Sequence, residues 1–253
     1  MHLQRLLEAL QPLAKLAGQR IMQVYAMDVQ AIAKADGSPV TLADQAADAV
    51  IVQGLASIAP HIAVVSEEKA DSHALAPPET YFLVDPLDGT KEFLKRDGKG
   101  AFTVNIALIQ DGAPVAGVVY APALDRMFAG AQACGAFETT AGVTRRIACK
   151  QVDTTCLVAV ASESHRDEQT NAWLMQHQVA RTTSIGSSLK FCLLAAGEAD
   201  VYPRFSPTME WDTAAGDAVL RAAGGIVQHP SGEAFAYSKP GYRNGGFVAW
   251  GVR

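Results

Sequence analysis

The chain has 253 residues, 49% of them hydrophobic and 19% charged, and a formal net charge of −5. An acidic protein of this kind is not expected to bind nucleic acid polymers, because non-specific binding needs a basic surface. No segment approaches ~20 uninterrupted apolar residues, so we expect no membrane-spanning helix and no integral membrane contact.

Apolar residues recur at helical spacing over the first 25 positions, which predicts an amphipathic helix rather than a signal peptide. Four scattered cysteines, with no two at C-x-x-C spacing, fit a reducing compartment. We therefore predict a cytoplasmic protein. Peripheral attachment of the first helix at the cytoplasmic face of the inner membrane is left open, as is a homodimer.

Turn residues and apolar runs predict the further elements of the N-terminal half. Thr41 should cap a helix that ends near Ser57, with Asp44 at the reciprocal position of a capping box. Two short strands, each with acidic residues at its end, are predicted at 62–68 and 81–86. A surface loop at 69–80 should connect them. Three antiparallel strands are predicted at 102–112, 113–122 and 126–137.

Strands and helices alternate in the C-terminal half. We predict strands at 156–162, 199–205, 225–229 and 247–252, helices at 166–178 and 212–225, and a loop entering a helix at 184–197. The pattern indicates a layered α/β fold with two portions. The α+β portion 1–137 carries an antiparallel sheet and acidic motifs, and the α/β portion 138–253 completes the active site.

Three acidic stretches end apolar strands or open helices. They are "SEE" at 66–68, "DPLDGT" at 85–90 and "EWD" at 210–212. Carboxylate oxygens without a neighbouring His or Cys suit hard cations, Mg²⁺ before Ca²⁺. Glu67 and Glu68 are adjacent, so in a strand they point to opposite faces and at most one reaches such a cluster.

The DPLDGT stretch combines acids with an anion site. Pro86 should stop the strand, so that Asp85 and Asp88 turn toward one point, where the Leu87 carbonyl can join them. Gly89 allows close backbone approach, and a helix that opens at Thr90 offers free N–H groups to an anion. A metal cluster beside an anion site is what phosphate-ester hydrolysis requires.

Each acid also has a purely structural interpretation. Asp212 can act as a helix cap, and Asp44 fits a capping box better than a metal site. The spacing D-x-x-D-G-T is one residue longer than the D-x-D-G-T of phosphatases that form an aspartyl-phosphate. That route is therefore a minor alternative.

"SEE" at 66–68, "DPLDGT" at 85–90 and "WDTAAGDAV" at 211–219 resemble the three signatures of the lithium-sensitive, magnesium-dependent phosphatases typified by inositol monophosphatase. The similarity covers essentially the whole chain. "VDPLDGTKEF", "FTVNIALI", "GVVYAP" and "TTSIGSSLKFCLLAAGEADVYPRF" are similar to the bisphosphate nucleotidase branch. The resemblance implies the α/β/α/β/α sugar-phosphatase sandwich.

By resemblance, Glu67, Asp85 and the Leu87 carbonyl would hold one Mg²⁺, and Asp85, Asp88 and Asp212 a second, with a third, weaker site open. Glu67, Thr90 and Asp88 would be the catalytic residues, with Glu67 and Thr90 orienting the attacking water. Substrate would contact Glu67, Leu87, Asp88, Gly89, Thr90 and Asp212. The implied reaction is hydrolysis of the 3'-phosphate of adenosine 3',5'-bisphosphate by metal-activated water, with the sulfated analogue also open as a substrate.

A second phosphate needs its own partners. Ser187 and Lys190 lie at the start of the predicted helix, and Arg204 is a further candidate. Ser187 could equally be a plain cap and Lys190 a solvated surface residue. The rival functions are an inositol monophosphatase, a fructose-1,6-bisphosphatase or a non-catalytic metal- or nucleotide-sensing protein.

Overall fold

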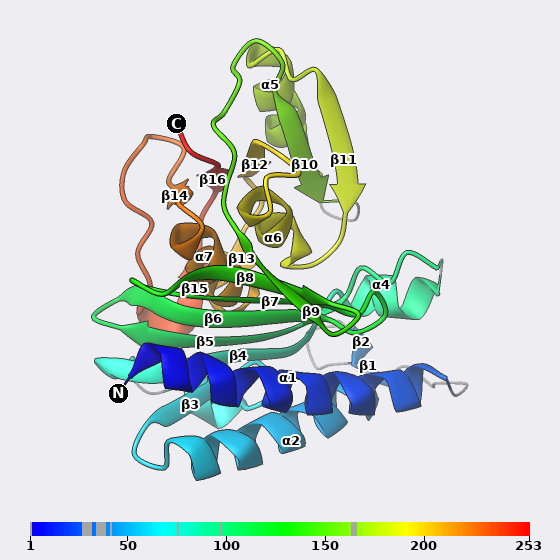
Figure 1. Ribbon diagram of the computed structural model, residues 1–253, viewed down its shortest axis with the longest axis vertical. Coiled ribbons are helices and arrows are strands. Elements are labelled where there is room, and N and C mark those ends of the chain that lie inside the picture. The colour runs from blue at the N-terminus through cyan, green and yellow to red at the C-terminus, as the bar shows by residue number, and fades with distance from the viewer. Residues whose placement is uncertain are drawn as a thin grey trace.

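The computed structural model describes residues 2–26, 32–33, 39–40, 42–74, 76–96, 98–162 and 166–253. In these residues, helices and sheets alternate in five layers (Figure 1). The layers are a helix pair, a seven-stranded sheet, a second helix pair, a five-stranded sheet and an outer helix. The predicted α/β/α/β/α sandwich is confirmed, whereas the predicted Thr41 cap lies outside the described residues.

The first layer consists of α1 (Leu3–Tyr25) and α2 (Leu42–Ile58), which lie side by side on one face of the seven-stranded sheet (Figure 1). Helix α1 buries one apolar stripe that includes Leu6, Leu10 and Ile21, as the helical spacing predicted. Each such leucine contributes about 1.5–3 kcal/mol through burial. None of the described helices is long and apolar enough to cross a lipid bilayer.

The seven-stranded sheet has its strands in chain order. They are β3 (Ala63–Ser66), β4 (Thr80–Asp88), β5 (Thr103–Gln110), β6 (Ala113–Ala121), β7 (Arg126–Ala131), β8 (Gly135–Thr140) and β9 (Val143–Ile147). Strand β3 runs parallel to β4, and each later pair is antiparallel.

The last strands of this sheet differ from the prediction in two ways. The single strand predicted at 126–137 is wrong, because a turn at 132–134 divides it into β7 and the start of β8. Strand β9 was missed, because its polar residues face solvent at the sheet edge and carry no apolar alternation. The sheet continues to Ile147, so position 137 falls inside β8.

Strand β4 does not stop at Pro86, as was predicted, but continues to Asp88 through a register shift. Asp85 pairs with Asn105 and Asp88 with Thr103, so three steps along β4 oppose two along β5. This is the geometry of a β-bulge, where a proline without an N–H is tolerated. The extra residue places Asp85 and Asp88 on the same face of the sheet.

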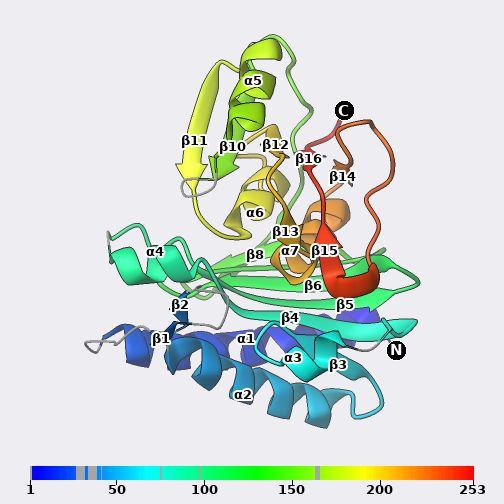
Figure 2. The same ribbon diagram turned by 180° about the vertical axis from the view of Figure 1, so that it is seen from behind.

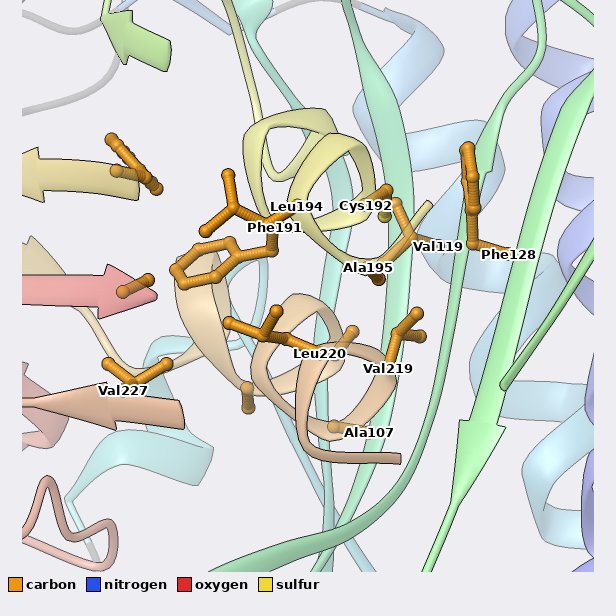
Figure 3. Close-up of a cluster of buried hydrophobic side chains, with 14 of the residues drawn as sticks. Ala107, Val119, Phe128, Phe191, Cys192, Leu194, Ala195, Val219, Leu220 and Val227 are labelled. Atoms are coloured by element: carbon orange, nitrogen blue, oxygen red, sulfur yellow. The ribbon is translucent and has the colours of Figure 1, made fainter. Parts of the chain in front are cut away.

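The second helix pair, α6 (Leu189–Ala195) and α7 (Trp211–Ala222), lies between the two sheets. Figure 3 shows Phe191 and Leu194 of α6 and Val219 and Leu220 of α7 within this core. Gly117 of β6 makes the packing possible, because a Cβ there would lie 2.5 Å from the Ala215 carbonyl oxygen.

The five-stranded sheet has the strand order β11-β10-β12-β16-β14. Its strands are β10 (Val158–Ser162), β11 (Arg181–Ile185), β12 (Val201–Arg204), β14 (Ile226–Gln228) and β16 (Phe247–Trp250). The outer helix, α5 (Glu168–Gln176), is capped by Asp167 and packs Leu174 against the outer face of this sheet. Strand β11 was not predicted, because its sequence is polar and largely exposed.

Short elements complete the chain. They are β1 (Ile32–Ala33), β2 (Pro39–Val40), α3 (Ala70–His73), α4 (Thr90–Lys95), β13 (Thr208–Met209), β15 (Arg243–Asn244) and a 3₁₀ turn at Pro240–Tyr242. Helix α3 lies within the predicted surface loop 69–80. Figure 2 shows α4 beside the sheet, on the side where β11 ends.

Candidate active site

A cleft of about 290 Å³ lies between the seven-stranded sheet and the C-terminal half of the chain. It gathers every residue that the sequence assigned to the site. These are Glu67, Asp85, Leu87, Asp88, Gly89, Thr90, Ser187, Lys190, Arg204 and Asp212. They come from the ends of β3, β4 and β12 and from the starts of α4, α6 and α7. The chain thus brings distant motifs to one place.

Three carboxylates form the centre of the cleft. Glu67, Asp85 and Asp212 each offer an oxygen atom, and these atoms all lie within 4.8 Å of one another. Asp85 is 1% exposed. An all-oxygen donor set from three carboxylates fits Mg²⁺, whereas Zn²⁺ sites usually include nitrogen or sulfur ligands. The donor set therefore suits the cation that the resemblance implied.

The electrostatics of these acids are unfavourable without a cation. Burial raises the pKa of Asp85 well above its usual range, and the charges of Glu67, Asp88, Asp212 and Asp44 raise it further. Burial, Asp88 and Glu67 likewise raise the pKa of Asp212 to about 8. A divalent cation would offset this repulsion and favour the ionised forms.

Asp88 lies between the acids and the cations of the cleft. Burial raises its pKa, although Lys190, Ser188 and Arg204 act in the opposite direction. The backbone N–H of Ser188 donates to Asp88 Oδ2 at 2.5 Å. Burial lowers the pKa of Arg204, but Tyr202, Asp212 and Asp88 raise it overall. Asp88 therefore connects the acidic centre to a cationic region of the same cleft.

The segment after β4 forms a loop suited to an anion. Gly89 has φ 90°, a left-handed conformation that favours glycine, and helix α4 starts directly after it. The Leu87 N–H donates to Asp85 Oδ1 at 3.1 Å, and the Thr90 hydroxyl donates to the Leu87 carbonyl at 3.3 Å. These bonds fix the Asp85 side chain and the loop relative to each other.

Lys190 is not a solvated surface residue, because it is 2% exposed. Its Nζ donates to the carbonyls of Ser187 at 2.6 Å and Ile185 at 3.2 Å, and lies 5.2 Å from the Tyr202 ring centroid. An ammonium has three donors, so these two carbonyl bonds leave a third for an anion in the cleft.

The sequence offered Ser187 either as a phosphate-binding residue or as a helix cap, and in the structure the cap position belongs to Ser188. Ser188 is the N-cap of α6, and Ser187 sits before it with φ 54° and accepts a bond from the Leu189 N–H at 3.3 Å. The N–H of Ser188 is already bonded to Asp88. The Ser188 N–H is therefore not free to donate to a phosphate, and the proposed role of Ser187 stays a prediction.

Two further residues lie near the acids: Asp44, which the sequence assigned to a capping box, and His73, which it did not single out. Asp44 is buried in the first turn of α2 and contributes to the raised pKa of Asp85. The His73 ring stacks on Trp211 with centroids 4.5 Å apart, and its Nε2 donates to the Ser66 carbonyl at 2.6 Å. His73 thus links the segments that carry Glu67 and Asp212. Only the long-range fold brings these partners together.

The raised pKa of Asp212 predicts how the metal-free protein responds to pH. Its folded value of about 8 exceeds the ordinary 3.8, so ionisation opposes folding as the pH rises from about 4 to about 8. The metal-free protein should therefore melt at a lower temperature at pH ~8 than at pH ~6. Added Mg²⁺ should raise the melting temperature more at pH ~8.

Differential scanning calorimetry with and without a chelator measures both effects. K⁺ at matched ionic strength serves as the control for screening. An Mg²⁺-induced rise in melting temperature that is equal at both pH values, or larger at the lower one, would contradict the electrostatic account.

Comparison with known proteins agrees with these observations. The sequence profile of the inositol monophosphatase family matches residues 2–249. A curated protein from Escherichia coli (strain K12), named 3'(2'),5'-bisphosphate nucleotidase CysQ, is 48% identical over 241 residues, which cover 93% of this chain and 95% of that protein. The protein of the same name from Salmonella typhimurium is 47% identical over 246 residues, which cover 96% of this chain and 98% of that protein.

A solved structure is also similar over its whole length. The crystal structure of CysQ from Bacteroides thetaiotaomicron, described as a bacterial member of the inositol monophosphatase family, has a TM-score of 0.85 and 36% sequence identity. The match covers 100% of this chain and 98% of that one. The similarity therefore includes both halves of the fold and the cleft between them.

Proposed function

This chain belongs to the inositol monophosphatase family, and from this we propose that it is a Mg²⁺-dependent 3'(2'),5'-bisphosphate nucleotidase. Its substrate would be adenosine 3',5'-bisphosphate, hydrolysed at the 3' position to AMP and phosphate. The observation that carries the proposal is that the cleft has an acidic region and a cationic region next to each other. Three carboxylates gather in one region, and Asp88 connects them to Lys190 and Arg204.

The acidic region would hold the cations. Glu67, Asp85 and the Leu87 carbonyl would hold one Mg²⁺, and Asp85, Asp88 and Asp212 a second. Bound Mg²⁺ would lower the pKa of water and neutralise charge on the phosphate. Oxygen donors at one point and the bulge that aligns Asp85 with Asp88 support this assignment.

The chain's own residues would orient the reactants. Glu67 and the Thr90 hydroxyl would position the attacking water, and the backbone at Gly89 and Thr90 would bind the scissile phosphate. Lys190 and Arg204 would bind the second phosphate through charge-assisted hydrogen bonds. Direct attack on the phosphorus leaves no phospho-enzyme, so configuration at a chiral phosphorus should invert.

A substrate panel tests the proposal. Phosphate release would be measured for adenosine 3',5'-bisphosphate, its sulfated analogue, inositol 1-phosphate and fructose 1,6-bisphosphate, with Mg²⁺ alone and with added Li⁺. We expect kcat/KM for the adenosine bisphosphate to exceed that for inositol 1-phosphate by at least about tenfold. We also expect Li⁺ to inhibit, as the family resemblance implies.

The rival functions predict other outcomes of the same panel. Equal or faster turnover of inositol 1-phosphate would identify an inositol monophosphatase, and fastest turnover of fructose 1,6-bisphosphate would identify a sugar bisphosphatase. No turnover of any substrate with Mg²⁺ would favour a non-catalytic sensor. The cytoplasmic location stays a prediction, and a homodimer and the role in sulfur metabolism that the family resemblance implies stay open.

A further inference from the structure

Two buried polar residues of β5 lie directly across from two of the acidic residues. In the antiparallel register, Asn105 pairs with Asp85 and Thr103 pairs with Asp88. Directly opposed residues of an antiparallel pair project from the same face of the sheet, with their Cβ atoms about 4.5–5.5 Å apart. Asn105 and Thr103 therefore stand beside the carboxylates that would hold the cations.

Both side chains are fully buried, and no described residue hydrogen-bonds to them. Each residue has 0% exposure. The Asn105 amide nitrogen and oxygen and the Thr103 hydroxyl accept or donate no hydrogen bond within the part of the chain that the structure describes. An unsatisfied buried polar group costs about 1–3 kcal/mol, so such groups in native proteins usually contact an ordered water or an ion.

The other buried residues of β5 are all apolar, so a polar side chain is unusual in this strand. Ala107 and Ile109 continue the same face into the core between the sheets, and Val104 and Ile106 fill the core on the other face. Buried polar side chains thus occur in this strand only where it passes Asp85 and Asp88, since the one other polar residue, Gln110, is exposed at its end. Apolar residues at positions 103 and 105 would avoid the cost.

We propose that Asn105 and Thr103 are positioning residues of the cation site, holding ordered water that hydrogen-bonds to the carboxylates of Asp85 and Asp88. The inference rests on the proposed function. Neither side chain hydrogen-bonds directly to the acids, so a water between them would make the connection. An amide and a hydroxyl beside two carboxylates supply the two to four polar partners that a buried water needs.

Hydrogen bonds from Asn105 and Thr103, through water, would orient the carboxylates of Asp85 and Asp88. Carboxylates that bind metals are themselves usually hydrogen-bonded, which fixes their orientation, and loss of an outer partner typically costs 10–100-fold in metal affinity. Asp88 receives one such bond from Ser188, and Asp85 from Leu87. Water held by Asn105 and Thr103 would orient the remaining carboxylate oxygens.

The test compares Mn²⁺ binding by electron paramagnetic resonance, without substrate, in the wild type and in Asn105→Leu, Asn105→Ser and Thr103→Val. Asn105→Leu and Thr103→Val should weaken Mn²⁺ binding about tenfold. Asn105→Ser, which keeps a hydroxyl and leaves room for another water, should bind within about threefold of the wild type. Thr170→Val, at a buried threonine of α5, is the matched control and should bind normally.

Melting temperatures of the metal-free variants separate this role from a structural one. Because Asn105 hydrogen-bonds to no other described residue, Asn105→Leu should leave the melting temperature of the metal-free protein unchanged or higher. Wild-type binding by Asn105→Leu, or a lowered metal-free melting temperature with no rescue by Asn105→Ser, would overturn the inference. Absence of Mn²⁺ binding by the wild type would instead overturn the proposed function, and the inference with it.

Discussion

Asp85→Asn should nearly abolish phosphatase activity while making the metal-free protein more stable. The substitution keeps an oxygen that can accept from the Leu87 N–H, but it removes a charge that is repelled by Glu67, Asp88, Asp212 and Asp44. Loss of a direct ligand should cost at least as much as loss of an outer partner, so we expect kcat/KM to fall by at least about 100-fold.

The gain in stability is measured on the same protein. Without metal, the melting temperature at neutral pH should rise by at least about 2 °C, as expected for ~1 kcal/mol in a protein of this size. The rise on adding Mg²⁺ should shrink. Asp111→Asn is the matched control, because Asp111 is exposed in the β5–β6 turn with φ 51°, which asparagine also adopts. An active Asp85→Asn variant would refute the assignment of Asp85.

Lys190→Met should selectively weaken hydrolysis of substrates that carry a second phosphate. The substitution retains length and removes the buried ammonium that lines the cleft. A hydrogen bond to a charged group is worth about 1.5–3 kcal/mol, so kcat/KM for adenosine 3',5'-bisphosphate should fall by about 10–100-fold. Adenosine 3'-monophosphate, which lacks only the 5'-phosphate, should lose much less.

The comparison of these two substrates corrects for indirect effects. Lys190 also lowers the pKa of Asp88 and holds the carbonyls of Ile185 and Ser187, and damage to these would affect both substrates alike. Lys150→Met, which removes a lysine paired with Asp200 and absent from the cleft lining, is the control. Equal losses for the two substrates would show that Lys190 does not bind the second phosphate.

The sequence predicted the elements that have a clear local signature. Helix α1 follows from apolar residues at helical spacing, and β5 and β6 follow from apolar runs on either side of Asp111-Gly112. The acidic motifs could be assigned to one site because carboxylates at strand ends require compensation. These inferences depend on local chemistry, and the structure agrees with them.

Other features depend on contacts that no local pattern encodes. The polar edge strands β9 and β11 lack apolar alternation, so their pairing with neighbouring strands defines them. The bulge at Pro86 appears only when β4 is paired with β5. Asp44 was assigned to a capping box, because its proximity to Asp85 depends on how α2 packs against the sheet.

Lys190 illustrates the same limit for a charged residue. Lysines are almost never fully buried unless they are paired, so a surface position was a reasonable interpretation of the sequence. In the structure, the carbonyls of Ile185 and Ser187 and the ring of Tyr202 provide that pairing. These partners come from the end of β11, the loop after it and β12, whose positions follow only from the complete fold.

Anomalous scattering from crystals grown with Mn²⁺ and AMP tests the central claim most directly. Strong anomalous peaks should lie within bonding distance of carboxylate oxygens of Glu67, Asp85 and Asp212, with at least one peak shared with Asp88. Mn²⁺ bound only elsewhere, with these carboxylates unligated in an enzyme that Mn²⁺ activates, would contradict the account.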